Sequence, residues 1–255
     1  NWNYQNLTVN STDATTDTFQ LGAALDVNGA FRLQAGTLNC NSQTQTYAGN
    51  FQLDAGTTFT KGGAITFDGT SAATYTDSTA GVQNIGAVTI GKTSGTAADN
   101  KLTLASSLKV DTLTINANNT LDLASSGYTL TLSNAGSTAT VFTNNGTLTP
   151  GTSTVKYSAT NSAGNVNVTT TTYNSLQLSG VETYDLTGNL TGTNAMTGNL
   201  TIDSGATLDT TSANSYGITL AGNWANSGTF TPNANTVTFD GSGTSTLSGS
   251  TTFYD

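Results

Sequence analysis

Short segments in which apolar and polar residues alternate follow one another along the chain with almost no gap. Residues 102–104, 113–115, 121–123 and 130–132 are Leu-Thr-Leu, Leu-Thr-Ile, Leu-Asp-Leu and Leu-Thr-Leu. A period of two places apolar side chains on one face and polar ones on the other, as in a half-buried β-strand. Gly, Asn, Asp and Ser between the segments favour tight corners. The pattern predicts very short strands joined by corners and almost no helix.

Strands this short do not suit a β-sandwich, whose strands are usually longer. They suit an all-β chain folded as a β-solenoid (β-helix), in which inward apolar positions form a stacked core and Thr and Asn face water. One coil cannot bury its own inner face, so stability depends on neighbouring coils. The alternative is a tandem array of β-sandwich domains. It would need linkers, and the composition does not shift near residues 84 or 174.

Two landmarks recur along the chain and divide it into three superrepeats. An aromatic or apolar residue, an Asn and an apolar strand occur together around Asn6, Asn84 and Asn174, and Asp255 lies at the next such place. A second landmark places Phe67, Tyr157 and Phe239 at steps of 90 and 82 positions. We therefore expect one elongated β-solenoid over residues 1–255, with superrepeats of roughly 80–90 residues at about 1–83, 84–173 and 174–255.

The composition excludes several classes of function. Thr, Asn, Ser and Gly make up 135 of the 255 residues, the net charge is −9 with only six basic residues, and histidine is absent. Phosphate recognition requires clusters of Lys and Arg, so we expect no nucleic-acid partner. Without histidine, a Ser-His-Asp triad and the usual zinc sites are impossible. The Asp residues occupy turn positions and no two are paired as in a glycosidase. We expect no enzyme, cofactor or metal.

Four sequence features are considered for the compartment. The chain has no apolar run long enough for a membrane span. Few Lys residues and long Thr/Ser/Asn/Gly tracts are associated with an extracellular or cell-surface protein. The single Cys40 is expected to be a buried small apolar residue. Candidate N-glycosylation triplets, Asn-X-Ser/Thr, begin at seven positions: Asn6, Asn10, Asn118, Asn145, Asn167, Asn189 and Asn199.

The third superrepeat carries a family resemblance. Its segments Gly198–Asp209, Ile218–Pro232 and Thr236–Gly241 resemble the β-strand repeats of very large secreted and surface proteins of bacteria, similar to filamentous-haemagglutinin-like proteins and autotransporter passenger solenoids. The resemblance implies an exported, elongated, non-enzymatic protein that takes part in adhesion or builds an extracellular layer or fibre. It carries over no functional residue, because the shared positions are strand and turn positions.

The phase of the landmarks suggests how the chain assembles. The sequence starts just before one landmark and stops at the next equivalent one, so a second copy placed end to end would continue the pattern. We expect an extracellular structural module that polymerises with itself into a surface filament or layer by adding strand to strand. The expected contact strands contain Tyr4, Asn6, Leu7 and Val9 at one end and Phe253 and Tyr254 at the other.

The alternative function is that of an adhesin stalk or passenger module that binds cell-surface glycans or a host surface. Exposed aromatic rings would be its sugar-stacking platforms, although at the landmark positions an aromatic residue is more often part of the core. The candidate rings are Tyr128, Tyr157, Tyr173, Trp224 and Tyr254.

Overall fold

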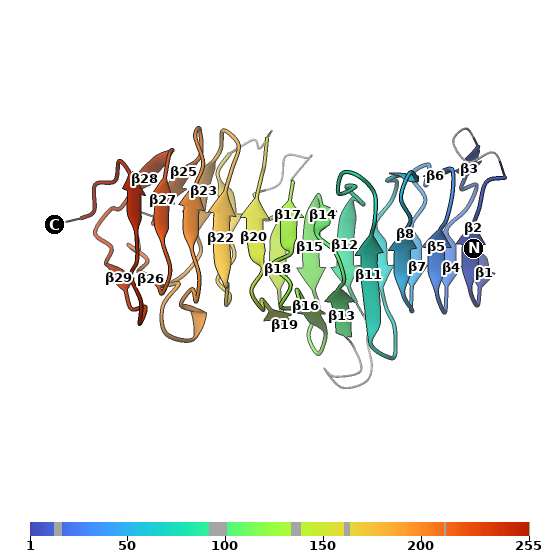
Figure 1. Cartoon of the computed structure of the whole chain (residues 1–255), viewed down its shortest axis with the longest axis horizontal. Coiled ribbons are helices and arrows are strands. Elements are labelled where there is room, and N and C mark those ends of the chain that lie inside the picture. Colours follow the sequence, from blue (N-terminus) through green and yellow to red (C-terminus); the bar gives the residue numbers. More distant parts are fainter. Residues whose placement is uncertain (13–16, 92–100, 134–138, 161–163, 212, 255) are drawn as a thin grey trace. The chain divides into compact units, whose positions relative to one another are not determined.

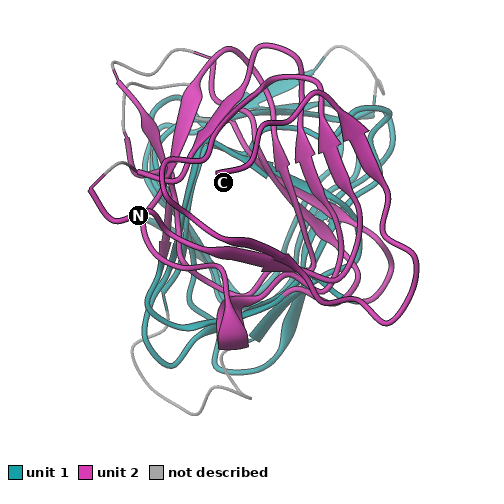
Figure 2. Ribbon diagram, turned by 90° about the vertical axis from the view of Figure 1, so that its left-hand side faces the viewer, with its two compact units in different colours: residues 1–124, 144–149 teal, residues 125–143, 150–255 magenta. Residues whose placement is uncertain are grey.

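The structure is a computed structural model that describes residues 1–12, 17–91, 101–133, 139–160, 164–211 and 213–254. The described residues form strands β1 to β30 and one 3₁₀ turn, η1 (Gly192–Asn194) (Figure 1). The chain divides into two compact units, unit 1 (residues 1–124 and 144–149) and unit 2 (residues 125–143 and 150–255), which are coloured in Figure 2. Asp255, the last landmark position, lies outside the described residues.

Unit 1 contains three parallel sheets, called A, B and C here. Sheet A contains β1 (Trp2–Tyr4), β4 (Leu25–Val27), β7 (Gln45–Tyr47), β10 (Ile65–Phe67), β12 (Ala87–Ile90) and β15 (Thr112–Ile115). Sheet B contains β2 (Leu7–Val9), β5 (Phe31–Leu33), β8 (Phe51–Leu53), β11 (Ala73–Asp77), β13 (Lys101–Leu104), β16 (Thr120–Asp122) and β19 (Thr147–Thr149). Sheet C contains β3 (Thr18–Gln20), β6 (Thr37–Asn39) and β9 (Thr58–Thr60), and β14 (Leu108–Val110) is joined to Asn84 by a single bridge.

Unit 2 also contains three parallel sheets, D, E and F. Sheet D contains β17 (Thr129–Leu132), β20 (Thr154–Tyr157), β22 (Ser175–Leu178), β24 (Leu200–Ile202), β27 (Trp224–Asn226) and β30 (Leu247–Gly249). Sheet E contains β21 (Val166–Val168), β23 (Thr183–Leu186), β25 (Thr207–Asp209) and β28 (Thr229–Thr231), and sheet F contains β26 (Ile218–Leu220) and β29 (Val237–Phe239). The remaining strand is β18 (Phe142–Asn144).

Neighbouring strands within each unit are parallel and belong to successive coils. In sheet A, Trp2 is paired with Leu25, Leu25 with Gln45 and Gln45 with Ile65, so the chain returns to the same sheet after 23, 20 and 20 positions. Between these returns it passes through the other sheets. This arrangement is a β-solenoid of about ten turns, which confirms the predicted all-β solenoid and not the sandwich alternative. Among the described residues, no helix is long and apolar enough to cross a membrane.

The alternating pattern places the apolar side chains inside the coils. In β5, Phe31 and Leu33 are buried whereas Arg32 between them is exposed. In unit 1, the rings of neighbouring coils pack on one another, and Phe51 stacks on Tyr75 with centroids 5.5 Å apart. Cys40 is buried and unbridged, as expected, and burial raises the pKa of its thiol to about 12. The core of each coil is therefore completed by the coils beside it.

Asparagine side chains fasten the corners of one coil to the backbone of the next. Asn6 Oδ1 accepts the Ala30 N–H at 2.8 Å, and Asn50 Oδ1 accepts the Thr74 N–H at 2.9 Å. In unit 2, Asn199 Oδ1 accepts the Asn223 N–H at 2.8 Å. These bonds satisfy backbone N–H donors of the next coil. The landmark residue Asn6 is thus a corner residue that holds two coils together.

Loss of one inward ring is expected to destabilise unit 1 strongly. Phe51 is 0% exposed and contacts the rings of Phe31, Tyr47 and Tyr75. Phe51→Ala should lower the free energy of unfolding by about 3–5 kcal/mol, because a cavity forms in the core. The outward-facing control Thr76→Ala should cost less than about 1 kcal/mol. Denaturant titration followed by circular dichroism measures both, and equal losses would contradict the inward and outward assignment.

Candidate functional site

The first coil of unit 1 has inward side chains that its neighbour covers on one side only. Trp2 and Tyr4 of β1 are paired with Leu25 and Val27, which are buried core residues. Trp2 and Tyr4 therefore occupy inward positions of the first coil. Nevertheless Trp2 is 41% and Tyr4 is 40% exposed. In the described residues, β1, β2 and β3 each have a paired strand on one edge only. Within the described residues, no coil covers this face of unit 1.

The same face is hollow and apolar. Phe19 of β3 is paired with the buried Leu38 and is 38% exposed, and Leu7 and Val9 of β2 are paired with Phe31 and Leu33. Together these side chains surround a hollow of about 250 Å³, which we call the end hollow. No lining residue is charged; they are Trp2, Tyr4, Leu7, Val9, Phe19, Gln20, Leu21, Leu25 and Leu38. Such a surface favours burial against another apolar surface.

The last coil of unit 2 ends differently. Leu247 of β30 is 53% exposed, whereas Phe253 is half-buried and its ring lies 5.3 Å from Trp224 and 6.0 Å from Phe230. Residues 250–254 belong to no strand, so the expected edge strand through Phe253 and Tyr254 is not present. The apolar interior draws the Phe253 ring over the end of the core. Tyr254 remains 60% exposed.

The sequence-predicted contact residues fall into three groups. Tyr4, Leu7 and Val9 line the end hollow together, whereas Asn6 lies at the corner beside them. Phe253 and Tyr254 lie at the end of unit 2. Sequence reasoning missed Trp2 and Phe19, the largest exposed apolar side chains of the hollow besides Tyr4. The signal that identifies them is their pairing with the buried residues of the second coil, which requires the coil register.

The candidate glycosylation sites are accessible in most cases. Six of the seven acceptor residues are exposed in the structure: Asn6, Asn10, Asn118, Asn145, Asn189 and Asn199. Asn167, in β21, is half-buried. Attachment of a glycan to these residues stays a prediction.

The aromatic residues considered as sugar platforms are mostly core residues. Tyr157 and Tyr173 are 0% exposed, and their hydroxyl oxygens lie 3.0 Å apart in a hydrogen bond. Trp224 is 1% exposed. Of the five candidates, Tyr254 is exposed and Tyr128 is half-buried. The three buried rings cannot stack on a sugar.

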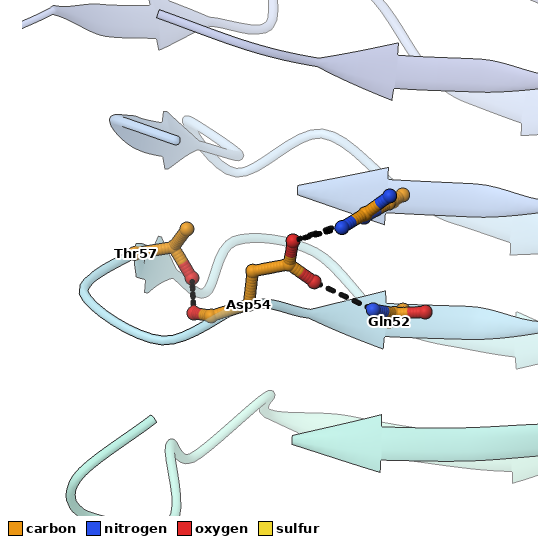
Figure 3. Close-up of polar contacts among 4 residues, drawn as sticks. Gln52, Asp54 and Thr57 are labelled. Carbon is orange, nitrogen blue, oxygen red and sulfur yellow. Dashed lines mark hydrogen bonds and ion pairs between the residues drawn. The ribbon is translucent and has the colours of Figure 1, made fainter. Parts of the chain in front are cut away.

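Basic side chains in the described residues are largely matched by aspartates that lie one or two coils further along the chain. The Arg32 guanidinium donates to Asp54 Oδ2 at 2.6 Å, and Figure 3 shows Gln52 directing its amide at the same carboxylate. The hydrogen bond from Arg32 lowers the pKa of Asp54, assisted by that from Gln52. Three similar ion pairs join Lys61 to Asp111, Lys101 to Asp122 and Lys156 to Asp203. These pairs fasten coils together, and within the described residues they leave no continuous basic patch.

Acidic residues do not form a metal centre in the part of the chain that is described, where no group of three or more His, Cys, Asp or Glu residues could hold a metal ion. Among the described carboxylates, Asp68 has a buried oxygen, Oδ1, without a hydrogen-bond partner. Burial, followed by the charge of Asp26, raises the pKa of Asp68. This is an electrostatic cost of the fold at neutral pH.

Comparison with protein-family models, with curated proteins and with solved structures found no match to this chain. The candidate site therefore rests on the geometry of the coil ends.

Asp68→Asn and Asp54→Asn should change stability in opposite directions at pH 7. The folded pKa of Asp68 is raised, so its ionised form destabilises the fold at pH 7 and this cost disappears as the pH falls through that pKa. The folded pKa of Asp54 is lowered, so its contribution is present at neutral pH and is lost as the pH falls through the folded value.

We therefore expect Asp68→Asn to raise the free energy of unfolding at pH 7 and Asp54→Asn to lower it. Both differences from the wild type should shrink at pH 3. Urea titrations at the two pH values test this, and effects of the same sign at pH 7 would contradict the assignment.

Proposed function

We propose that this chain is a non-enzymatic, extracellular or cell-surface structural module whose coils stack end to end with those of a second copy, giving a filament or layer. The observation that carries the proposal is the exposure of Trp2, Tyr4 and Phe19 at inward positions of the first coil. Their partners in the next coil are buried only because another coil covers them. A coil of a second copy would cover the first coil in the same way.

The geometry of both ends supports a coil as the occupant of this face. In the described residues, unit 1 ends in the edge strands β1, β2 and β3, one from each of its three sheets, and unit 2 ends in β28, β29 and β30, one from each of its sheets. Each edge strand has backbone N–H and C=O groups that a further parallel strand can pair with. Because the two ends differ, such a contact is heterologous and continues into an open chain of copies.

The chemistry of the chain supports a structural rather than a catalytic role. The net charge of −9 disfavours a nucleic-acid partner, because its phosphates would be repelled. The sequence contains no histidine, so it lacks the commonest general base of enzymes. No cofactor is part of the proposal. The proposed extracellular location is supported by the composition alone.

The adhesin alternative has weaker support. Three of the five aromatic residues considered for glycan stacking are buried. An adhesin would need another surface, and a screen of the soluble protein against glycans would detect it as saturable binding without self-association.

Self-association should depend on the end hollow and should be visible in the fluorescence of Trp2. Of the two tryptophans, Trp224 is 1% and Trp2 is 41% exposed, so burial of Trp2 should shift the emission to shorter wavelength as the concentration rises. Trp2→Asp should weaken association at least about tenfold, because an unpaired carboxylate would be buried in the contact. Phe19→Asp should do the same from another sheet.

Sedimentation velocity and negative-stain microscopy of the 255-residue chain provide the measurement. Val181→Asp is the matched control, since Val181 is 76% exposed and does not line the end hollow. Monomers at every concentration, with no change of emission, would refute end-to-end stacking.

A further inference from the structure

The end of unit 2 carries an aromatic side chain, Phe253, that packs on three core rings of the last coils. The Phe253 ring packs at 5.3 Å from Trp224, 6.0 Å from Phe230 and 6.4 Å from Phe239, so it extends the core by one ring. Phe253 is only half-buried, and it lies on the same coil end as the exposed Leu247 and Tyr254.

Buried polar groups hold this segment in place. The Trp224 Nε1–H donates to Thr251 Oγ1 at 2.9 Å, and the Asn226 amide donates to the Ser250 carbonyl oxygen at 2.9 Å and to Thr251 Oγ1 at 3.1 Å. Trp224 and Asn226 are 1% and 3% exposed, so these partners spare both groups the cost of an unsatisfied buried donor. The segment is thereby fastened to the coil by specific hydrogen bonds.

The turn that directs the segment inward requires glycine. Gly249, the last residue of β30, has φ +81°, a left-handed conformation that side chains disfavour. A Cβ atom there would lie 1.7 Å from the Asn226 carbonyl oxygen. The chain can leave β30 in this direction only because position 249 has no side chain. The position of Phe253 is thus built into the fold.

From these contacts we infer that Phe253, with Leu247 and Tyr254 beside it, is the apolar knob that occupies the end hollow of a second copy. The inference rests on the proposed end-to-end stacking and names the residues on the partner side of that contact. The end hollow has a volume of about 250 Å³ and an uncharged lining. It can hold a phenyl ring, whereas a charged side chain would be buried there without a partner. An aromatic anchor seated in an apolar pocket is the usual centre of a protein interface.

The fastening of the knob adds to the strength of the contact. A side chain that is held before binding loses less conformational entropy on binding. Because Thr251 and Gly249 fix the segment in the free chain, the inferred contact requires no refolding at either end. The knob belongs to unit 2 and the hollow to unit 1, so each copy offers one of each.

A complementation experiment tests the inference. Phe253→Asp removes the knob and Trp2→Asp blocks the hollow, each in the 255-residue chain. We expect each variant alone to remain monomeric at concentrations where the wild type assembles. An equimolar mixture should form a 1:1 heterodimer, because one intact knob and one intact hollow remain. Analytical ultracentrifugation of the mixture detects the heterodimer, and circular dichroism verifies that both variants are folded.

The outcomes separate the two proposals. If Phe253→Asp assembles like the wild type, the knob is refuted while end-to-end stacking stands. If Phe253→Asp stops at a dimer that Trp2→Asp cannot form, the hollows meet each other and the knob is also refuted. If the wild type itself never assembles, stacking fails and the knob fails with it.

A glycine pair tests whether the knob must be held in place. Gly249→Ala leaves the Phe253 ring intact but disturbs its turn, and it should weaken self-association at least about tenfold. Gly243→Ala is the matched control, because a Cβ there meets no atom within 4 Å. Equal association by both variants would show that the fixed position of Phe253 contributes nothing.

Discussion

The structure depends on the burial of each coil's inward apolar side chains by the neighbouring coils. Tyr4 and Tyr47 occupy equivalent inward positions of sheet A, each paired with Val27, yet Tyr47 is 1% exposed and Tyr4 is 40% exposed. Residue type does not explain this difference. It arises because a coil lies on both sides of Tyr47 and on one side of Tyr4. A stacked core of this kind is incomplete wherever the stack stops.

The outward groups keep the coils in register. Parallel pairing repeats the same contact from coil to coil, so a polar side chain can bond one coil further along, as Asn199 does with the Asn223 backbone and Arg32 with Asp54. Exposed ion pairs of this kind stabilise little individually. The register itself is set by the apolar side chains, because a shift by one residue would turn them outward. The polar pairs favour the same register, since they form only when the coils are aligned in it.

The sequence was sufficient to predict the all-β solenoid, the inward Leu, Val and Phe positions and the burial of Cys40, because alternation and corner residues are local properties. It was not sufficient to predict which strands are neighbours. Coil lengths vary between corners, so Tyr157 and Phe239, equivalent in the sequence repeat, lie in different sheets, D and F. The exposure of Trp2 and the inward turn of Phe253 depend on packing between coils, which local patterns do not contain.

The proposed joint between copies differs from a joint between coils in one physical respect. Coils within the chain are covalently connected, so stacking one on another costs no translational freedom, whereas a second copy must offset that loss on binding. Weak contacts spread evenly over the coil face would not suffice. The energy has to be concentrated in a few large apolar side chains at the centre of the contact. Trp2 and Phe19 at one end and Phe253 at the other are such side chains, and each lies at the end of its unit's stacked core.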